Sequence, residues 1–292
     1  TAPTKTDNRY HMPAILTIDS AACRRCGRCA RVCPSGVFEA APDGTIAVAA
    51  ADRCISCGHF VAACPADAVR HNHFPPEKVH AADRSALPTP DQVLLLCRIR
   101  RSNRAFTSDP VPHDRLLRIV EAAHRAPTAS NRQQVSFTLV TDPEQLRLVT
   151  RYTLDTFASI ARKLRHPLVR PWLSRIMPDT YRYLPAFDRM RRAYEEHGTD
   201  GILRGATALL LIHTPGDNAF GAIDANLAYQ NASLMAESMG ISQFYTGFVY
   251  MALRHGKARR LTRALGIEGT IHAGMALGMP RFLFDRYIDK KP

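Results

Sequence analysis

The sequence has no apolar run long enough to span a bilayer. A transmembrane helix needs about 20 consecutive apolar residues, and the longest apolar stretches, such as residues 206–213, are far shorter. Apart from two cysteine runs described below, it also has no internal repeat with a period of about 20 to 50 residues, which excludes a solenoid. With 292 residues, 46% of them hydrophobic, the chain suits two globular domains, one small and one large enough to bury its own core.

Lysine is scarce, since six of the 39 basic residues are Lys and the rest are Arg. The formal net charge of +13 would ordinarily suggest nucleic-acid binding. The arginines, however, are scattered along expected helices, without interleaved aromatic residues or a known binding motif. We therefore expect no nucleic-acid partner, and interpret the excess of Arg as coding bias together with phosphate binding. The basic surface better suits an acidic partner protein.

Seven of the eight cysteines lie between positions 23 and 64, in two runs. The first run reads C-x-x-C-x-x-C-x-x-x-C-P, from Cys23 to Pro34. This is the ligand pattern of bacterial two-cluster ferredoxins, in which the fourth cysteine binds the other cluster. The second run, from Cys54 to Pro65, has the same spacing, but Phe60 stands where its third cysteine should be. The pattern predicts iron-sulfur clusters, with one thiolate missing.

Exchanging the fourth ligands between the runs assigns every cysteine of both runs to a cluster. The first cluster would be bound by Cys23, Cys26, Cys29 and Cys64. The second would have three thiolates, from Cys33, Cys54 and Cys57. Three thiolates are compatible with a three-iron cluster, with no cluster, or with a four-iron cluster whose open iron takes water, substrate or the neighbouring His59. We predict one [4Fe-4S] cluster and a second iron-sulfur cluster of undefined type.

Structural zinc and disulfides are the main alternatives for these cysteines. A zinc site needs four ligands in two pairs, often with histidines, which seven cysteines with two Cys-Pro endings fit poorly. Disulfides conflict with the context, because no apolar targeting stretch opens the chain and a labile cluster suits a reducing cytoplasm. Cys97 lies apart in an apolar run, and we expect it to be a small buried hydrophobic residue.

We expect four segments along the chain. Residues 1–11 are polar and are expected to be an unstructured leader, residues 12–73 a ferredoxin-like iron-sulfur domain, residues 74–90 a linker rich in proline, and residues 91–292 the second domain. In that domain we expect helices at 91–101, after Pro112 and at 224–239, and strands at 135–140, 208–212 and 271–277. Residues 143–205, interrupted by prolines, are expected to form a helical insertion.

Three motifs of the second domain resemble the flavin-dependent nitroreductase family. Residues 100–106 read RRSNRAF, similar to the family's opening Arg-Arg-Ser-x-Arg-x-Phe. Residues 126–133 read APTASNRQ, similar to its Ala-Pro-Ser-x-x-Asn-x-Gln, and residues 278–281 read GMPR, similar to its Gly-Tyr-Pro-Lys. The resemblance covers nearly all of residues 91–290. It departs from the family at Gln134-Val135, where Pro-Trp is usual, and at Arg281, where Lys is usual.

The resemblance implies an α+β fold, nitroreductase-like, with FMN as the cofactor. Because arginine binds phosphate through a planar fork, Arg100, Ser102 and Arg281 are our candidates for the FMN phosphate. Arg101 and Arg104 would reach the ribityl chain or the N1/O2 edge of the ring, where positive charge stabilises the reduced flavin.

The family is an obligate dimer with its cofactor at the interface, so the resemblance also implies a homodimer with two FMN sites. It implies that the backbone around Thr246 and Gly247 faces flavin N5. The residues that would contact the FMN from the partner subunit are Pro127, Thr128, Ser130, Asn131 and Gln133.

The expected function is an FMN-dependent oxidoreductase that reduces a small, flat, conjugated acceptor, such as a nitroaromatic, a quinone or an enone, with electrons passed through the clusters. No side chain is expected to act as a catalytic acid or base, because the flavin carries the chemistry. The alternatives are a non-catalytic electron-transfer or redox-sensing module, and a dehydrogenase that exports electrons through the clusters. No G-x-G-x-x-G follows an expected strand, so a Rossmann site is absent. The donor would be NAD(P)H stacked on the flavin or a reduced ferredoxin-type carrier.

Two groups of aromatic and histidine residues complete the expectations. Some aromatic side chains could line the substrate pocket, although core packing explains each one taken alone. They are Tyr245, Phe244, Phe248, Trp172 and Tyr181. Histidines expected to be ordinary polar packing rather than ligands are His213, His255 and His272.

Overall fold

The computed structural model describes residues 14–290 and divides into two compact units. The first unit contains the described residues up to Leu87 together with Ser130–Arg132, and the second contains Pro88–Ala129 and the described residues from Gln133 onward. The leader expected at residues 1–11 lies outside the described residues. Among residues 14–290, no helix is long and apolar enough to cross a membrane.

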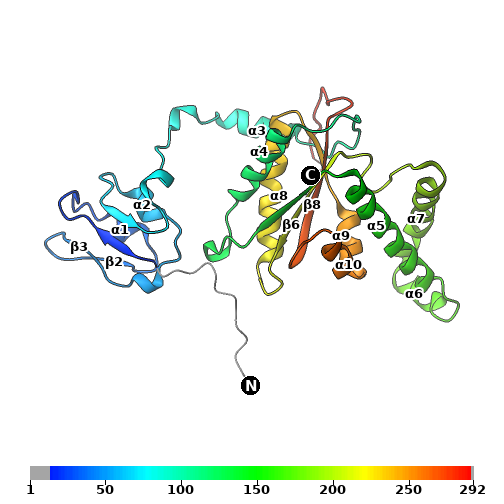
Figure 1. Ribbon diagram of the computed structural model, residues 1–292, viewed down its shortest axis with the longest axis horizontal. Helices are drawn as coiled ribbons and strands as arrows, with labels where there is room; N and C mark the ends of the chain where they lie inside the picture. Colours follow the sequence, from blue (N-terminus) through cyan, green and yellow to red (C-terminus); the bar gives the residue numbers. More distant parts are fainter. Residues whose placement is uncertain (1–13, 291–292) are drawn as a thin grey trace, which may run out of the picture. The chain divides into compact units, whose positions relative to one another are not determined.

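The first unit is built from two small antiparallel sheets and two short helices (Figure 1). Strand β1 (Leu16–Ile18) pairs with β4 (Val69–His71), and β2 (Phe38–Ala40) pairs with β3 (Ile46–Val48). Helices α1 (Arg28–Val32) and α2 (His59–Ala63) pack on each other. The described residues 51–86 also contain 3₁₀ turns at Ala51–Arg53, Pro76–Lys78 and Arg84–Ala86, and a further one lies at Ala129–Asn131.

The two short helices begin and end in the same way. Each starts after a glycine in the left-handed region, Gly27 with φ 69° and Gly58 with φ 75°, a conformation that only glycine adopts without strain. Each is followed by a cysteine with extended backbone, Cys33 or Cys64, because the proline that follows disfavours helical backbone there. The Cys-Pro dipeptides therefore fix where both helices stop.

The second unit is centred on a four-stranded antiparallel sheet in the order β5-β6-β8-β7. Its strands are β5 (Ser136–Val140), β6 (Ala208–Thr214), β7 (Ser242–Tyr245) and β8 (Thr270–Gly278). Helices cover both faces (Figure 1), with α4 (His113–His124) and α8 (Gly221–Ser238) on one and α5 (Pro143–Leu164) and α9 (Gly247–His255) on the other.

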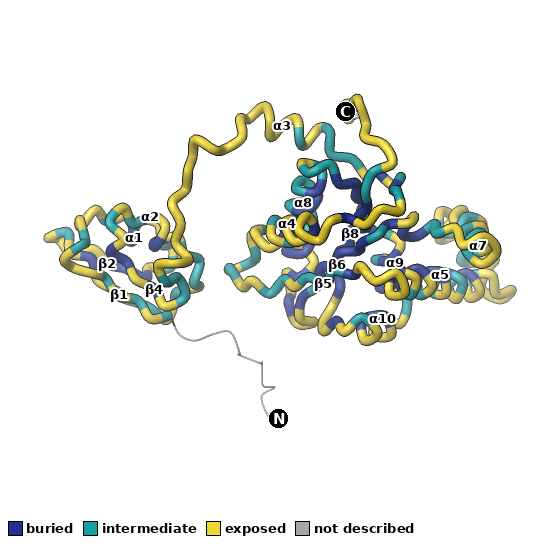
Figure 2. The backbone as a smooth tube through the Cα atoms, turned by 45° about the horizontal axis from the view of Figure 1, so that its top comes forward, coloured by how far each residue is buried: buried dark blue, intermediate teal, exposed yellow. Residues whose placement is uncertain are grey.

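The central strand β6 explains why the sheet needs two covering layers. Its side chains alternate between faces, so Leu209 and Leu211 pack in the core beneath α5 and α9, whereas Leu210 and Ile212 pack beneath α4 and α8. Figure 2 shows β6 and β8 as the most deeply buried part of this unit. A strand buried on both faces reads as a continuous apolar run, which is how residues 208–212 appear in the sequence.

The segment 143–205 forms three helices. These are α5, already given, α6 (Arg170–Ile176) and α7 (Pro178–His197), which contains Pro185. Helices α5 and α7 are joined by stacking of Phe157 on Phe187, whose ring centroids are 4.4 Å apart, and by an ion pair between Arg165 and Asp188. Helix α10 (Ala258–Ala264) follows α9.

Helix α3 (Pro90–Ile99) shows one wrong expectation. It begins with a capping box, in which Thr89 Oγ1 accepts the Gln92 N–H at 3.3 Å and Gln92 Oε1 accepts the Thr89 N–H at 2.9 Å. Cys97, expected to be buried, is exposed on this helix. The apolar run around it was misleading, because none of the residues of α3 is buried within the described chain.

Candidate cluster and flavin sites

The four cysteines assigned to the first cluster surround one small cavity. Cys23, Cys26, Cys29 and Cys64 all line it, together with apolar residues of the small core. Burial raises the pKa of the Cys29 thiol, and the nearby charges of Cys23 and Cys64 add to the effect. The Ala68 N–H points at Cys64 Sγ, at 3.2 Å, the type of hydrogen bond that stabilises a cluster thiolate. The residues present therefore fit a cluster bound by four thiolates.

The three cysteines assigned to the second cluster also lie near one another. Burial raises the pKa of the Cys54 thiol, a hydrogen bond from the Ser56 N–H counteracts this, and the charges of Cys57 and Cys33 raise it further. Phe60, at the place of the missing cysteine, is 1% exposed. Its ring packs edge-on against Phe38, with centroids 4.9 Å apart. An apolar ring therefore stands in the sequence position where the fourth thiolate of this set is missing.

All eight cysteines are free thiols. Among residues 14–290, no group of three or more histidine, cysteine or acidic side chains could hold a single metal ion.

The arginine-rich segment 100–106 lies between two other parts of the second unit. Ser102 pairs with Gln243 of β7, and Phe106 pairs with Pro280. The Arg281 N–H donates to the Ala105 carbonyl at 2.9 Å, and its guanidinium donates to the Phe106 carbonyl at 3.3 and 3.4 Å. The fold thus brings the first and last sequence motifs, about 175 residues apart, side by side.

The predicted arginines of this segment have different surroundings. The Arg104 guanidinium lies over the Phe244 ring, 5.4 Å from its centroid. The Arg101 N–H donates to Glu237 at 3.4 Å. Burial raises the pKa of Glu237, and the Arg101 N–H and the charge of Arg100 counteract this shift. Arg100 therefore lies near α8. Ser102 and Arg104 are exposed and remain available to a ligand.

Sequence reasoning missed the buried polar residues that position this segment. Gln243 is fully buried; its Nε2 donates to Ser233 Oγ at 2.8 Å and to the Arg101 carbonyl at 3.5 Å, and its Oε1 accepts from Tyr229 at 2.8 Å. Asn103 is also buried, and its Nδ2 donates to the Phe282 carbonyl at 2.8 Å. Asn103 was the unassigned position within a recognised motif, which is the one signal that could have identified it.

The loop after Pro127 has a strained backbone. Ser130, Asn131 and Gln133 have φ values of 52°, 52° and 51°, a left-handed conformation that is uncommon for residues other than glycine and that concentrates at functional sites. Thr128 Oγ1 accepts the Gln133 N–H at 3.0 Å. Pro127, Thr128 and Gln133 belong to the second unit, whereas Ser130 and Asn131 are grouped with the first.

Two oxygens next to this loop are buried without a partner in the described chain. They are Gln134 Oε1 and Asp224 Oδ2; the other Asp224 oxygen accepts the Ala129 N–H at 3.1 Å. A buried oxygen without a hydrogen bond is costly. These groups suit a site that a ligand or a second subunit completes, and Gln134 stands at a departure from the family pattern.

The Thr246-Gly247 corner is rigid on one side and open on the other. The buried Thr246 donates its N–H to the Gly274 carbonyl at 2.9 Å, and a Cβ on Gly274 would lie 2.4 Å from Thr246 Oγ1. In contrast, a Cβ on Gly247 would meet no atom within 4 Å. Gly247 also begins α9, so free backbone N–H groups lie at this corner. The corner therefore has open space beside the first backbone N–H groups of α9.

The aromatic and histidine side chains named from the sequence differ in burial and in their hydrogen bonds. Phe244 is buried in the core, whereas Trp172 is 67% exposed and Phe248 37%. The hydroxyls of Tyr245 and Tyr181 donate to the carbonyls of His272 and Leu164. His213 and His272 hydrogen-bond Thr138 and Thr214, at 3.0 and 2.9 Å, and burial lowers the pKa of both histidines. His255 is exposed.

The chain matches known proteins in both units. The profile described as "Nitroreductase family" matches residues 98–279, and the profile described as "4Fe-4S dicluster domain" matches residues 15–65. A curated relative, the FMN reductase [NAD(P)H] of Bacillus subtilis (strain 168), is 25% identical over 183 residues. That match covers 62% of this chain and 62% of the relative.

Two solved structures share the fold. The nitroreductase with bound FMN from Bacteroides fragilis NCTC 9343 is 20% identical, with a TM-score of 0.52, and the match covers 68% of this chain and 95% of that one. The nitroreductase with bound FMN from Desulfitobacterium hafniense DCB-2 is 19% identical, with a TM-score of 0.53, and covers 69% and 96%. The expected α+β, nitroreductase-like fold with a ferredoxin-like domain is confirmed.

Substitution of Phe60 tests the role of the missing thiolate. Phe60→Cys should add a fourth thiolate to the second set and raise the iron content to about eight atoms per chain, as measured by iron and sulfide analysis of anaerobically purified protein. Phe38→Cys is the matched control, because it also removes a buried ring of the same core but lies outside the ligand spacing. If Phe60→Cys has the iron content and cluster potentials of the unaltered protein, the missing thiolate is incidental.

Proposed function

We propose that the protein is an FMN-dependent oxidoreductase whose iron-sulfur clusters exchange electrons with the flavin. The chain belongs to the nitroreductase family and carries a 4Fe-4S dicluster domain. Its acceptor is a small, flat, conjugated molecule, such as a nitroaromatic, a quinone or an enone. When bound, FMN can take up two electrons and release them singly or as a hydride, whereas a cluster transfers one electron at a time. A chain with both cofactors links these two types of chemistry.

The observation that carries the proposal is the pairing of segment 100–106 with β7 and with residues 280 and 281. It supports the proposal because it joins the segment that carries Arg100 and Ser102 to the backbone of Arg281, and these three residues are our candidates for the FMN phosphate. Two planar guanidinium groups and a hydroxyl are strong donors for a phosphate dianion. Arg101 and Arg104 would lie along the ribityl chain or the N1/O2 edge, where their charge favours the reduced ring. The open corner at Gly247 would face N5.

We also propose that the protein is a homodimer with two FMN sites at its interface. The second unit exposes apolar side chains on α8, including Ile223 (59%) and Leu227 (43%), and in the C-terminal segment, including Phe282, Phe284 and Ile288. An apolar surface of this kind is typical of an interface. In the dimer, the residues that would contact the FMN of the other subunit are Pro127, Thr128, Ser130, Asn131 and Gln133. The other subunit or the FMN would also provide hydrogen-bond partners for the buried oxygens near this loop.

Two classes of electron donor suit the chain. NAD(P)H could stack directly on the flavin, in keeping with the described activity of the Bacillus subtilis relative. A reduced ferredoxin-type protein could instead deliver electrons through the clusters, and the net charge of +13 would attract such an acidic carrier.

Turnover separates the enzyme from the alternatives. The protein, reduced anaerobically with a ferredoxin-type carrier or with NAD(P)H, should reduce many equivalents of a nitroaromatic or quinone acceptor, as followed by acceptor absorbance. A single stoichiometric reoxidation would instead indicate an electron-transfer or sensor module. Reduction of the clusters by the organic compound alone, without a donor, would indicate a dehydrogenase working in the opposite direction.

Substitution of Arg281 tests the phosphate site. Arg281→Ala should weaken FMN binding about 10- to 150-fold, because a hydrogen bond to a charged group contributes about 1.5–3 kcal/mol. Arg281→Lys, which restores the residue usual in the family, should bind FMN nearly as well as the unaltered protein. Fluorescence titration of apoprotein with FMN measures both. Equal affinity of the alanine variant would remove Arg281 from the site.

Substitution of Leu227 tests the interface. Leu227→Glu places a charge on the exposed face of α8, so the protein should sediment as a single chain of 32.4 kDa and lose FMN. Leu168→Glu is the matched control, because Leu168 is 84% exposed and lies between α5 and α6, away from the proposed interface. An unaltered protein that sediments as one chain while retaining FMN would contradict the dimer proposal.

A further inference from the structure

The second cysteine set has a buried histidine beside it that the cysteine pattern does not reveal. His71, the last residue of β4, is 3% exposed, and its Nε2 lies 3.6 Å from Cys54 Sγ. It lies beyond the 15–65 region that matches the dicluster domain. His59, the histidine suggested by the sequence as a ligand for this site, is exposed. His71 is thus the histidine that contacts a ligand of the second cluster.

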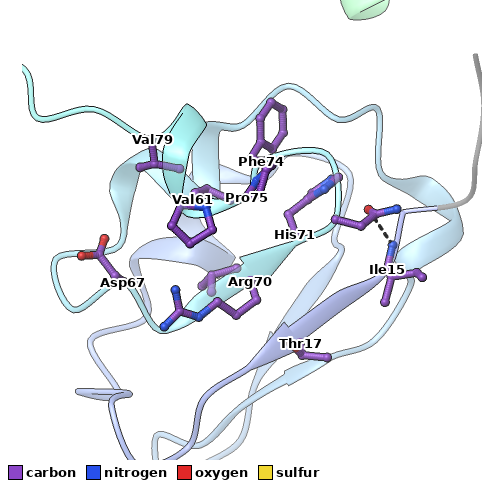
Figure 3. A pocket seen from close by; sticks show the side chains of 12 residues that line it. Ile15, Thr17, Val61, Asp67, Arg70, His71, Phe74, Pro75 and Val79 are labelled. Atoms are coloured by element: carbon purple, nitrogen blue, oxygen red, sulfur yellow. Dashed lines mark hydrogen bonds between the residues drawn. The ribbon is translucent and has the colours of Figure 1, made fainter.

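The His71 ring is held in one orientation. It stacks on Phe60, with centroids 5.9 Å apart and an interplanar angle of 23°, and it lies 4.9 Å from the Phe74 ring. Figure 3 shows His71 and Phe74 at the edge of a pocket of about 360 Å³ in the first unit. The ring that replaces the missing cysteine therefore also supports the histidine.

The second ring nitrogen defines the position of the proton. The His73 N–H donates to His71 Nδ1 at 3.0 Å, so Nδ1 must present a lone pair. A neutral imidazole carries its proton on the other nitrogen, which places it on Nε2. Ligation of iron through Nε2 would move the proton to Nδ1, where it would face the His73 N–H. The hydrogen-bond pattern thus makes Nε2 a donor.

We propose that His71 is a positioning residue that donates an Nε2–H···S hydrogen bond to the Cys54 thiolate and raises the reduction potential of the second cluster, without binding its iron. The inference depends on the proposal that Cys33, Cys54 and Cys57 bind a cluster. The Ser56 N–H donates to the same sulfur at 3.4 Å. Both donors stabilise negative charge on sulfur, which increases when the cluster is reduced.

A short network connects the histidine to the cluster loop. His73 Nδ1 and Ser56 Oγ are hydrogen-bonded at 2.9 Å, so the residue whose N–H fixes the His71 tautomer is itself attached to the loop between Cys54 and Cys57. The loop and residues 71–73 are therefore joined by two contacts, one through the Cys54 sulfur and one through the Ser56 hydroxyl. This arrangement holds the donor in place when the charge of the cluster changes.

The substitution experiment uses the full chain and the first cluster as an internal reference. His71→Phe should lower the potential of the second cluster, so that its ratio of reduced to oxidised form falls about tenfold at a fixed potential, equivalent to about 59 mV for a one-electron couple. The first cluster should not shift. A titration monitored by electron paramagnetic resonance measures both. His59→Phe is the matched control and should shift neither potential, and His71→Gln, which retains a donor, should recover part of the shift.

Pulsed electron paramagnetic resonance of the unaltered protein, labelled with ¹⁵N-histidine, distinguishes a donor from a ligand without any substitution. A weak nitrogen coupling and an exchangeable proton coupling to the second cluster would support the proposal. A strong coupling of a directly bound nitrogen would overturn it, as would an unchanged potential in His71→Phe when both clusters are present. If the unaltered protein has iron for the first cluster only, both this inference and the second cluster are wrong.

Discussion

The candidate flavin site depends on one buried amide. Gln243 lies in β7 with no exposed surface and connects three elements: α8 through Tyr229 and Ser233, the arginine-rich segment through the Arg101 carbonyl, and the sheet through its pairing with Leu277. Its side-chain oxygen and nitrogen are both paired, so the amide does not incur the cost of an unsatisfied buried group. These bonds act together with the pairing of Phe106 and Pro280 and with the Asn103 hydrogen bond to hold the arginine-rich segment. In the proposed site, charge would provide the affinity for phosphate, and this uncharged contact would help to fix the position of the arginine-rich segment.

The sequence revealed local chemistry better than it revealed long-range contacts. The cysteine runs could be interpreted directly because their spacing is set by tight turns and by the Cys-Pro stops, and the strand at 208–212 because burial on both faces requires an apolar run. Strand β7 and helix α9 were not predicted, because β7 has four residues and gains its stability from pairing with β8. The Gln243 network could not be predicted either, since its partners lie 10, 14 and 142 positions away. The failure at Cys97 has the same origin: an apolar run defines a helix face but not what covers it.

The first unit has too little apolar core to be independent of its cysteines. Its strands have three residues each and its helices five, whereas isolated helices shorter than about 12 residues are marginal in water. Its core contains Cys29, with Cys33, Cys54 and Cys64 packed against it. The ligands are thus part of the packing, and metal binding is coupled to folding in small domains of this type.

The two halves of the first unit share a backbone design but offer different electrostatic surroundings. Cys29 and Phe60 hold the same place in their runs, each in a short helix that begins after a left-handed glycine, and both side chains are buried. One half therefore presents four thiolates, and the other presents three, an aromatic ring and a histidine N–H. Fewer anionic ligands and an additional hydrogen bond both favour the reduced form. With clusters bound, an added electron would reside preferentially at the second site. The ring of Phe60 and the proposed His71 donor would together give the two cluster sites different affinities for an electron.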